Sequence, residues 1–182
     1  LVHGAAGGVG LAAVDLGKHL GAKVIATAST DEKLERIREA YQPEALINVT
    51  EGFREKVKEI TGGGADVIYD PVGGDVFDES VRCIAFDGRL LVIGFASGRI
   101  PEIGVNMPLI KGFSVVGVRA GEYGRRFPQK GRENIEAVWD LVARRAVRPH
   151  VHGIYSLDDW REAFAEMEER RVVGRVIIDP SQ

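Results

Sequence analysis

LVHGAAGGVG, at residues 1–10, is the stretch that decides the fold, because it joins an apolar strand end to a run of small residues. Ala5, Gly7 and Gly10 take the three special positions of the G-x-G-x-x-G pattern, with alanine in the first. Small residues there permit a tight turn and let a pyrophosphate approach the backbone. The N-terminus of the helix that follows offers unpaired N–H groups to the phosphates. The stretch therefore predicts a dinucleotide site between a strand and a helix.

The rest of the chain alternates between short β-rich runs and amphipathic segments, which is typical of βα units. The β-rich runs lack clean alternation of apolar and polar residues, which indicates strands covered on both faces of a parallel sheet. We therefore predict an α/β fold with a Rossmann-type doubly wound parallel sheet. Strands are expected at residues 1–3, 22–28, 45–49, 65–70, 88–95, 113–118, 151–157 and 174–179, and helices at residues 10–20, 29–40, 53–61, 75–85, 131–146 and 158–171.

The end of the second predicted strand discriminates between dinucleotides. An NAD site places Asp or Glu there to bind the ribose 2′-hydroxyl, whereas this chain has Ala28 followed by Ser29, with Lys33 one turn into the next helix. Hydroxyl groups and an ammonium group suit a 2′-phosphate, although Asp31 and Glu32 add negative charge nearby. The pattern favours NADPH over NADH. Ser29 or Thr30 also serves as a helix cap, and capping is compatible with phosphate binding.

Composition excludes several classes of partner. A formal net charge of −3 gives no electrostatic reason to expect nucleic acid or an anionic membrane. No apolar run approaches the roughly 20 residues that span a bilayer. The single cysteine, Cys83, cannot form an internal disulfide and is expected to be a core residue. A reducing, cytoplasmic location fits this cysteine usage.

Four longer stretches, in order along the chain, carry a family resemblance: VHGAAGGVGLAAV, VIATASTDEKL, YDPVGGDVFDES and GRLLVIGFASG. With the VVGRVIID ending, they resemble the quinone oxidoreductase (zeta-crystallin-like) branch of the zinc-free medium-chain dehydrogenase/reductase superfamily. The resemblance implies an NADPH-dependent reductase of quinones, α,β-unsaturated carbonyls or enoyl thioesters, without a metal. The cofactor-binding residues that it implies are Ala6, Gly7, Gly8, Val9, Ser29, Lys33, Val72, Gly94, Phe95, Ala96 and Ser97.

Val49 and Phe95 also bear on cofactor binding. In the family, a tyrosine after the third strand also touches the 2′-phosphate, but Val49 stands there, so the preference for NADPH is expected to be weaker. Phe95 is interpreted either as a ring contact to the cofactor or as a hydrophobic plug under its loop.

The resemblance also implies a missing part. Family members begin with a GroES-like domain that supplies most of the substrate pocket, so the chain is interpreted as an inactive cofactor-binding fragment. Residues 1–150 are expected to form the dinucleotide-binding domain, and residues 151–182 to belong to the absent domain. Four apolar residues of that last segment are then expected to be exposed, namely Ile154, Trp160, Phe164 and Ile177.

No side chain in the sequence is a convincing catalytic acid, base or nucleophile. The four histidines show no metal-ligand spacing, and Asp70, at a strand end, is expected to close a turn. Direct hydride transfer from the nicotinamide to a quinone or polarised alkene needs mainly positioning and exclusion of water. Both this chemistry and the missing domain are consistent with the lack of catalytic side chains.

The same residues allow alternative functions, and one strand indicates an oligomer. A non-catalytic, crystallin-like NADPH-binding protein and an enoyl-thioester reductase module fit the same residues, whereas the long match argues against a methyltransferase that uses S-adenosylmethionine. The substrate is expected to be a small molecule. The apolar run at residues 113–118 is expected to be the sheet edge and, as in the family, to pair with its copy in a homodimer.

Overall fold

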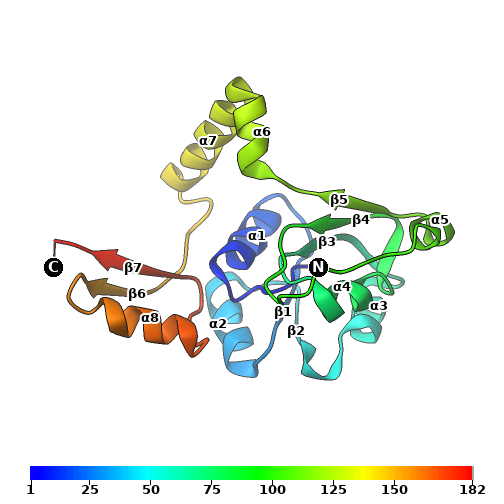
Figure 1. Cartoon of the computed structure of the whole chain (residues 1–182), viewed down its shortest axis with the longest axis horizontal. Coiled ribbons are helices and arrows are strands. Elements are labelled where there is room, and N and C mark those ends of the chain that lie inside the picture. Colours follow the sequence, from blue (N-terminus) through cyan, green and yellow to red (C-terminus); the bar gives the residue numbers. More distant parts are fainter. Residues whose placement is uncertain (182) are drawn as a thin grey trace. The chain divides into compact units, whose positions relative to one another are not determined.

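The computed structural model describes residues 1–181, whose helices and strands are labelled in Figure 1. These residues divide into two compact units. The glycine-turn unit comprises Val2–Glu51 and the residues from Pro149 onward, and the central unit comprises Leu1 and Gly52–Arg148. This division does not test the domain boundary expected after residue 150, which stays a prediction. The glycine-turn unit contains α1 (Gly8–His19), β1 (Ile25–Ala28), α2 (Asp31–Tyr41), β2 (Ala45–Asn48), the short 3₁₀ helix η1 (Val49–Glu51), β6 (Val151–Ser156), α8 (Trp160–Glu168) and β7 (Arg175–Asp179). The central unit contains α3 (Arg54–Thr61), β3 (Ala65–Asp70), α4 (Gly74–Ser80), β4 (Ile84–Val92), α5 (Asn106–Lys111), β5 (Ser114–Gly117), α6 (Ala120–Arg126) and α7 (Pro128–Ala143).

In the glycine-turn unit, β1 has strand partners on both sides. It pairs in parallel with β2, and the N–H of Val2 donates to the carbonyl of Ile25 at 2.8 Å. All four residues of β1 are buried, and Leu11 and Val14 of α1 and Ile37 of α2 are buried as well. The absence of polar alternation in this strand therefore does indicate burial on both faces.

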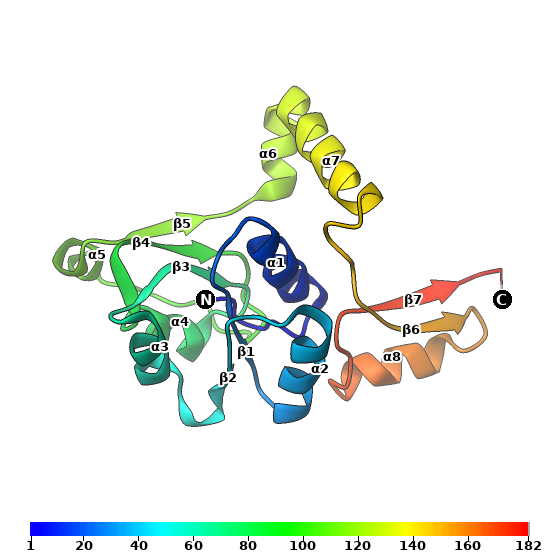
Figure 2. The ribbon, with the colours of Figure 1, turned by 180° about the vertical axis from the view of Figure 1, so that it is seen from behind.

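A second parallel pair of the same unit, β6 and β7, is covered by α8 (Figures 1 and 2). Apolar side chains nevertheless remain exposed here, as expected from the sequence. They are Ile154 at 56%, Trp160 at 41%, Phe164 at 50% and Ile177 at 41% exposure.

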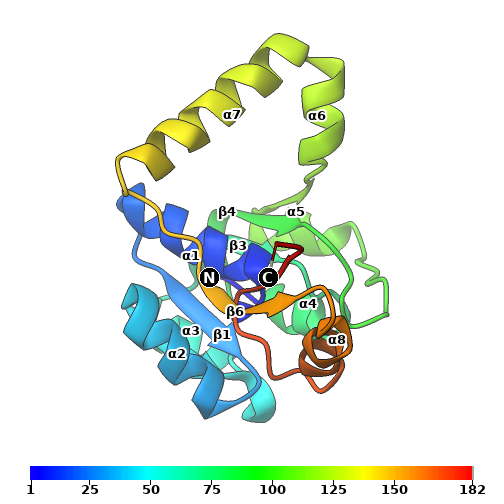
Figure 3. The same ribbon diagram turned by 90° about the vertical axis from the view of Figure 1, so that its left-hand side faces the viewer.

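The central unit contains a parallel sheet in the order β3-β4-β5. Leu1 adds to it, because the N–H of Tyr69 donates to the Leu1 carbonyl at 2.9 Å. β5 lies at the end of the order and all four of its residues are exposed, which confirms that residues 113–118 include an edge strand. In the same unit, α6 and α7 meet at the turn between them and diverge from it (Figure 3), with the backbones of Gly124 and Gly131 in close approach.

Helix starts and ends follow local chemistry in some places and tertiary contacts in others. Thr30, one of the two expected caps of α2, accepts a hydrogen bond from the Lys33 N–H at 3.3 Å. The start of α3 has no local cap, since its N-cap residue is Phe53. The carboxylate of Glu79, on α4, accepts hydrogen bonds from the N–H groups of Phe53 and Arg54 at 2.7 and 2.9 Å instead. Gly62 ends α3 in the left-handed conformation, with φ of 75°.

Two expectations about elements are wrong. The helix predicted at residues 75–85 ends at Ser80, and β4 begins at Ile84 rather than at residue 88. The reason is tertiary: Cys83 is fully buried and its carbonyl accepts the N–H of Ala65, which draws the segment into the sheet. The sequence patterns also missed η1, α5 and α6. α5 contains Pro108 and α6 contains two glycines, residues that weaken a helical pattern.

Candidate functional site

The glycine turn, residues 4–10, is held by backbone crowding. The N–H of Gly7 donates to the Gly4 carbonyl at 3.0 Å, and the N–H of Ala5 donates to the Thr27 carbonyl at 2.9 Å. A Cβ on Gly10 would collide with the Gly4 carbonyl and lie 2.7 Å from the Ala5 Cα. Because Gly7 is the N-cap of α1, no side chain caps the first amides of this 12-residue helix. Those amides are available to an anion.

Arg175, at the start of β7, lies beside this turn. The β7 segment reaches the turn through a backbone bond, since the Gly174 N–H donates to the Ala6 carbonyl at 2.8 Å. The Arg175 Cδ and Cζ lie 2.7 and 2.9 Å from the position that a Cβ on Gly8 would take. The first turn of α1 therefore has a guanidinium group next to its free amides. The sequence reasoning missed this residue, because about 165 positions separate it from the turn.

A pocket of about 620 Å³ lies where β1 ends. It is lined by residues of α2 and the two positions before it, of β6 and α8, and of the segments before β6 and β7. Lys33, Arg36 and Arg170 line it and form no ion pair within residues 1–181. Arg171 also lines it but is bound by carboxylates, at 2.7 Å from Glu166 and in contact with Glu169. Three unpaired cations thus face one pocket. The complete lining is Ser29, Thr30, Glu32, Lys33, Arg36, His150, Val151, His152, Glu166, Glu169, Arg170, Arg171 and Val173.

Asp31 and Glu166, two carboxylates near this pocket, are engaged by other side chains and so repel an anion less than free carboxylates would. Asp31 does not line the pocket, and its carboxylate accepts a hydrogen bond from the Asn48 side chain at 2.8 Å. Arg171 holds the pKa of Glu166 below its usual range, with a smaller contribution from His152. Glu32 is the carboxylate of α2 that does line the pocket. No carboxylate occupies the end of β1, where Ala28 is buried.

Of the two histidines near the C-terminal strands, His152 has side-chain partners. Both line the pocket, and His152 Nδ1 accepts the N–H of Val173 at 3.3 Å while its Nε2 lies 3.5 Å from the Glu166 carboxylate. Across residues 1–181, no group of three His, Cys, Asp or Glu side chains could hold a metal ion. The expectation that the protein uses no metal stays a prediction.

In the central unit, the turn after β3 is closed by Asp70. Its buried carboxylate accepts the N–H groups of Val72 and Gly73 at 2.8 and 2.9 Å. Burial raises the pKa of Asp70, and the two hydrogen bonds oppose that rise. Asp70 therefore closes a turn, as expected from the sequence.

The loop after β4 is hydrogen-bonded to this turn. The N–H of Ala96 donates to the Pro71 carbonyl at 3.1 Å, and that of Ser97 to the Val72 carbonyl at 3.0 Å. Phe95 is 41% exposed, so it is not a buried plug.

The predicted cofactor-binding residues therefore form a separate group in each unit. Ala6–Val9, Ser29 and Lys33 lie in the glycine-turn unit, whereas Val72 and residues 94–97 lie in the central unit. Their role toward a cofactor stays a prediction. Val49, noted as the departure from the family pattern, does not line the pocket.

Comparison with known proteins identifies the family. A family model described as zinc-binding dehydrogenase matches residues 8–144. The chain belongs to the zinc-binding dehydrogenase family. The chain is 40% identical, over its whole length, to a quinone oxidoreductase-like protein 2 homolog of Nematostella vectensis, and it spans 50% of that protein. It is 32% identical to a 2-haloacrylate reductase of a Burkholderia species, over 99% of this chain and 55% of that one.

Solved structures of zinc-binding dehydrogenase relatives agree with this fold. The structure of Escherichia coli quinone oxidoreductase complexed with NADPH matches 98% of this chain and 56% of its own, with a TM-score of 0.83 and 30% identity. The predicted Rossmann-type α/β fold and the resemblance to the quinone oxidoreductase branch are thereby confirmed. The chain spans about half the length of the curated relatives that it matches.

Proposed function

We propose that this chain binds NADPH, and that the protein transfers a hydride from it to a quinone or to an alkene conjugated with a carbonyl group. The observation that carries the proposal is the pocket after β1, where Lys33, Arg36 and Arg170 converge without ion-pair partners among the described residues. A phosphate monoester on the ribose matches such a cluster, because it carries nearly two negative charges.

The residues of the glycine turn fit the pyrophosphate of the same cofactor. The uncapped amides at the start of α1 would bind it, and the Arg175 guanidinium lies beside them. Gly10 permits the tight turn beside these amides, since any Cβ there would meet the Gly4 carbonyl. These contacts give affinity and orientation; NADPH, once bound, supplies the hydride.

The loops of the central unit would border the nicotinamide. In open α/β sheets, ligands bind at the carboxyl ends of the strands, where Val72 and the loop of residues 94–97 lie in this unit. None of these side chains is an acid or base. We therefore expect them to orient the ring and exclude water, and we assign no catalytic residue within the described chain.

The test is a titration with NADPH and NADH, followed by nicotinamide fluorescence. Wild type is expected to bind NADPH more tightly, and Lys33→Ala to weaken NADPH binding about tenfold while leaving NADH unchanged, as expected for loss of one charge-assisted contact. Arg38→Ala is the matched control, because Arg38 is on α2 but pairs with Glu35 at 2.8 Å and does not line the pocket. Equal binding of both dinucleotides would reject the 2′-phosphate assignment, and binding of neither would reject the cofactor. Tight NADPH binding with no reduction of any quinone or enone would favour the non-catalytic alternative.

We also propose a homodimer that forms through β5. Its four exposed residues are at the sheet edge, with Val115 and Val116 37% and 36% exposed. Val116→Asp is expected to give monomers by light scattering, and an unchanged dimer would reject this interface.

No helix among the described residues has the length and apolar character needed to cross a membrane. A cytoplasmic location stays a prediction, which cell fractionation can check.

A further inference from the structure

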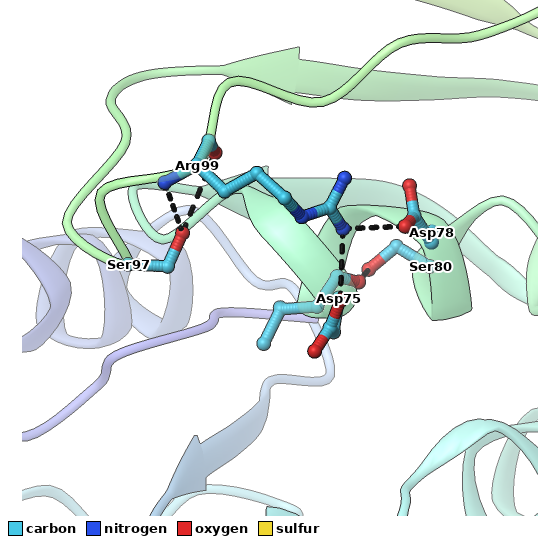
Figure 4. Close-up of polar contacts among 6 residues, drawn as sticks. Asp75, Asp78, Ser80, Ser97 and Arg99 are labelled. Carbon is cyan, nitrogen blue, oxygen red and sulfur yellow. Dashed lines mark hydrogen bonds and ion pairs between the residues drawn. The ribbon is translucent and has the colours of Figure 1, made fainter.

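Arg99 connects the loop after β4 to helix α4 (Figure 4). Its Nη2 donates to the Asp75 carboxylate at 2.9 Å and to the Asp78 carboxylate at 2.5 Å. The two aspartates are three residues apart on α4, so one guanidinium group reaches both. Ser97 lies at the other end of this short segment, with its Oγ 3.4 Å from the Arg99 N–H nitrogen.

The backbone under this contact is closely packed. Ala96 and Ser97 donate hydrogen bonds to the carbonyls of Pro71 and Val72. Gly74 has φ of 57°, which residues with a side chain rarely adopt, and a Cβ there would lie 2.7 Å from the Ser97 Oγ. Arg99 lies two residues after Ser97, and its side chain adds a contact between this loop and α4.

The Arg99 contacts do little for global stability. The Asp75 side chain is fully exposed, and those of Asp78 and Arg99 are about half exposed. Exposed ion pairs contribute little to the free energy of unfolding, because water and salt compete for both charges. Their effect is therefore expected to be local, on the tip of the loop at residues 96–99, since the N–H groups of Ile93 and Gly94 at its start donate to the Asp70 carbonyl and those of Ala96 and Ser97 to the turn.

We propose that Arg99 is a positioning residue that holds residues 94–97 against the turn at residues 71–74. This inference rests on the proposed function, in which that loop borders the nicotinamide. A loosened loop lowers the fraction of bound cofactor that is aligned for hydride transfer. The affinity for NADPH, in contrast, depends mainly on the cations of the glycine-turn unit. Loss of Arg99 thus lowers kcat more than it raises the Kd of NADPH.

The experiment compares Arg99→Ala, Arg99→Lys, the double variant Asp75→Asn/Asp78→Asn, and the triple variant with Arg99→Ala. The first readout is hydrogen exchange at the Ala96 and Ser97 amides, and the second is kcat for quinone reduction by the intact protein at saturating NADPH. Arg99→Ala is expected to speed exchange about tenfold and to lower kcat about fivefold, with partial rescue in Arg99→Lys, which keeps the charge but not the forked geometry. The triple variant is expected to be no worse than Arg99→Ala, because all three side chains act through one contact.

Arg126→Ala is the control, since it removes an exposed ion pair with Glu122 on α6 and is expected to change neither readout. Unchanged exchange in Arg99→Ala would overturn the inference, even in a protein that reduces quinones. Faster exchange with an unchanged kcat would also overturn it, because Arg99 would then hold the loop without any effect on hydride transfer. Faster exchange in a protein that oxidises no NADPH with any acceptor would instead support the contact and reject the proposed function.

Discussion

Two turns that each lead into a helix use their backbone amides in different ways. The glycine turn leads into α1, and no side chain caps the amides at the start of that helix. The turn after β3 leads into α4, and there the Asp70 carboxylate binds the amides of Val72 and Gly73. Amides already bonded to a carboxylate cannot receive a phosphate, and the carboxylate also repels it. Of these two glycine-containing turns, only the first is therefore suited to bind an anion.

The largest expected effect tests whether crowding fixes the glycine turn. Gly10→Ala places a Cβ against the Gly4 carbonyl, and we expect it to lower the free energy of unfolding by about 3 kcal/mol. Urea unfolding followed by circular dichroism measures the change. Gly17→Ala, on the same helix, is the control, because its Cβ would meet a Val24 side-chain atom at 3.2 Å rather than backbone. Equal unfolding midpoints for Gly10→Ala and wild type would contradict this account of the turn.

The next effect tests whether Asp70 has only a structural role in the second turn. Asp70→Ala leaves two backbone amides without their acceptor and is expected to cost about 2–3 kcal/mol of unfolding free energy. Asp70→Asn retains the single oxygen, Oδ1, that accepts both bonds, so its unfolding midpoint should stay close to wild type. Loss of quinone reduction in Asp70→Asn at full stability would show instead that the carboxylate takes part in the chemistry.

The third effect contrasts the buried titratable residues that precede the two turns. Burial raises the pKa of Asp70 but lowers the pKa of His3 to about 3, because it disfavours the charged form of each. Between pH 6.5 and 3 the unfolded state then binds more protons at His3 than the folded state, so stability falls as the pH falls. We expect His3 to contribute a loss of about 2 kcal/mol between pH 7 and pH 5. Urea unfolding at both pH values measures it, and His3→Gln should remove that part of the loss. The same pH dependence in wild type and His3→Gln would assign it to other groups.

The smallest expected effect concerns the start of α3, a third helix whose first amides can be compared with those of α1 and α4. At α3 the amides of Phe53 and Arg54 are bound by Glu79, which comes from another helix. Glu79→Ala is expected to lower the free energy of unfolding by about 1 kcal/mol, as for loss of an ordinary helix cap. Glu79→Gln keeps an acceptor oxygen and should lose less. Glu59→Ala, at an exposed position on α3, is the control, and an equal loss there would mean that Glu79 is not acting as a cap.

The sequence predicted most of the fold because local chemistry marks most element ends. The glycine turn, the Thr30 cap and Gly62 lie within a few residues of the helices that they start or end. The prediction failed where a distant contact decided the conformation. At Cys83, hydrogen bonding to Ala65 and complete burial overrode a helical pattern.

For the candidate site, the sequence identified Ser29 and Lys33 because they directly follow β1. It could not identify Arg170 or Arg175, which enter the glycine-turn unit from the other end of the chain. Nor could it assign Asp75 and Asp78 to Arg99, since ion pairs more than 20 residues apart leave no local pattern.

By itself, then, the sequence determined the family, the order of the strands and of the longer helices, and the turn where an anion can approach bare backbone. These depend on residue size and on the spacing of apolar and capping residues, which act over a few positions. Only the tertiary structure decided which cations share a pocket, which amides remain free, and which exposed ion pairs connect a loop to a helix. Those properties depend on distances between segments that are far apart in the chain, and chain folding alone sets such distances.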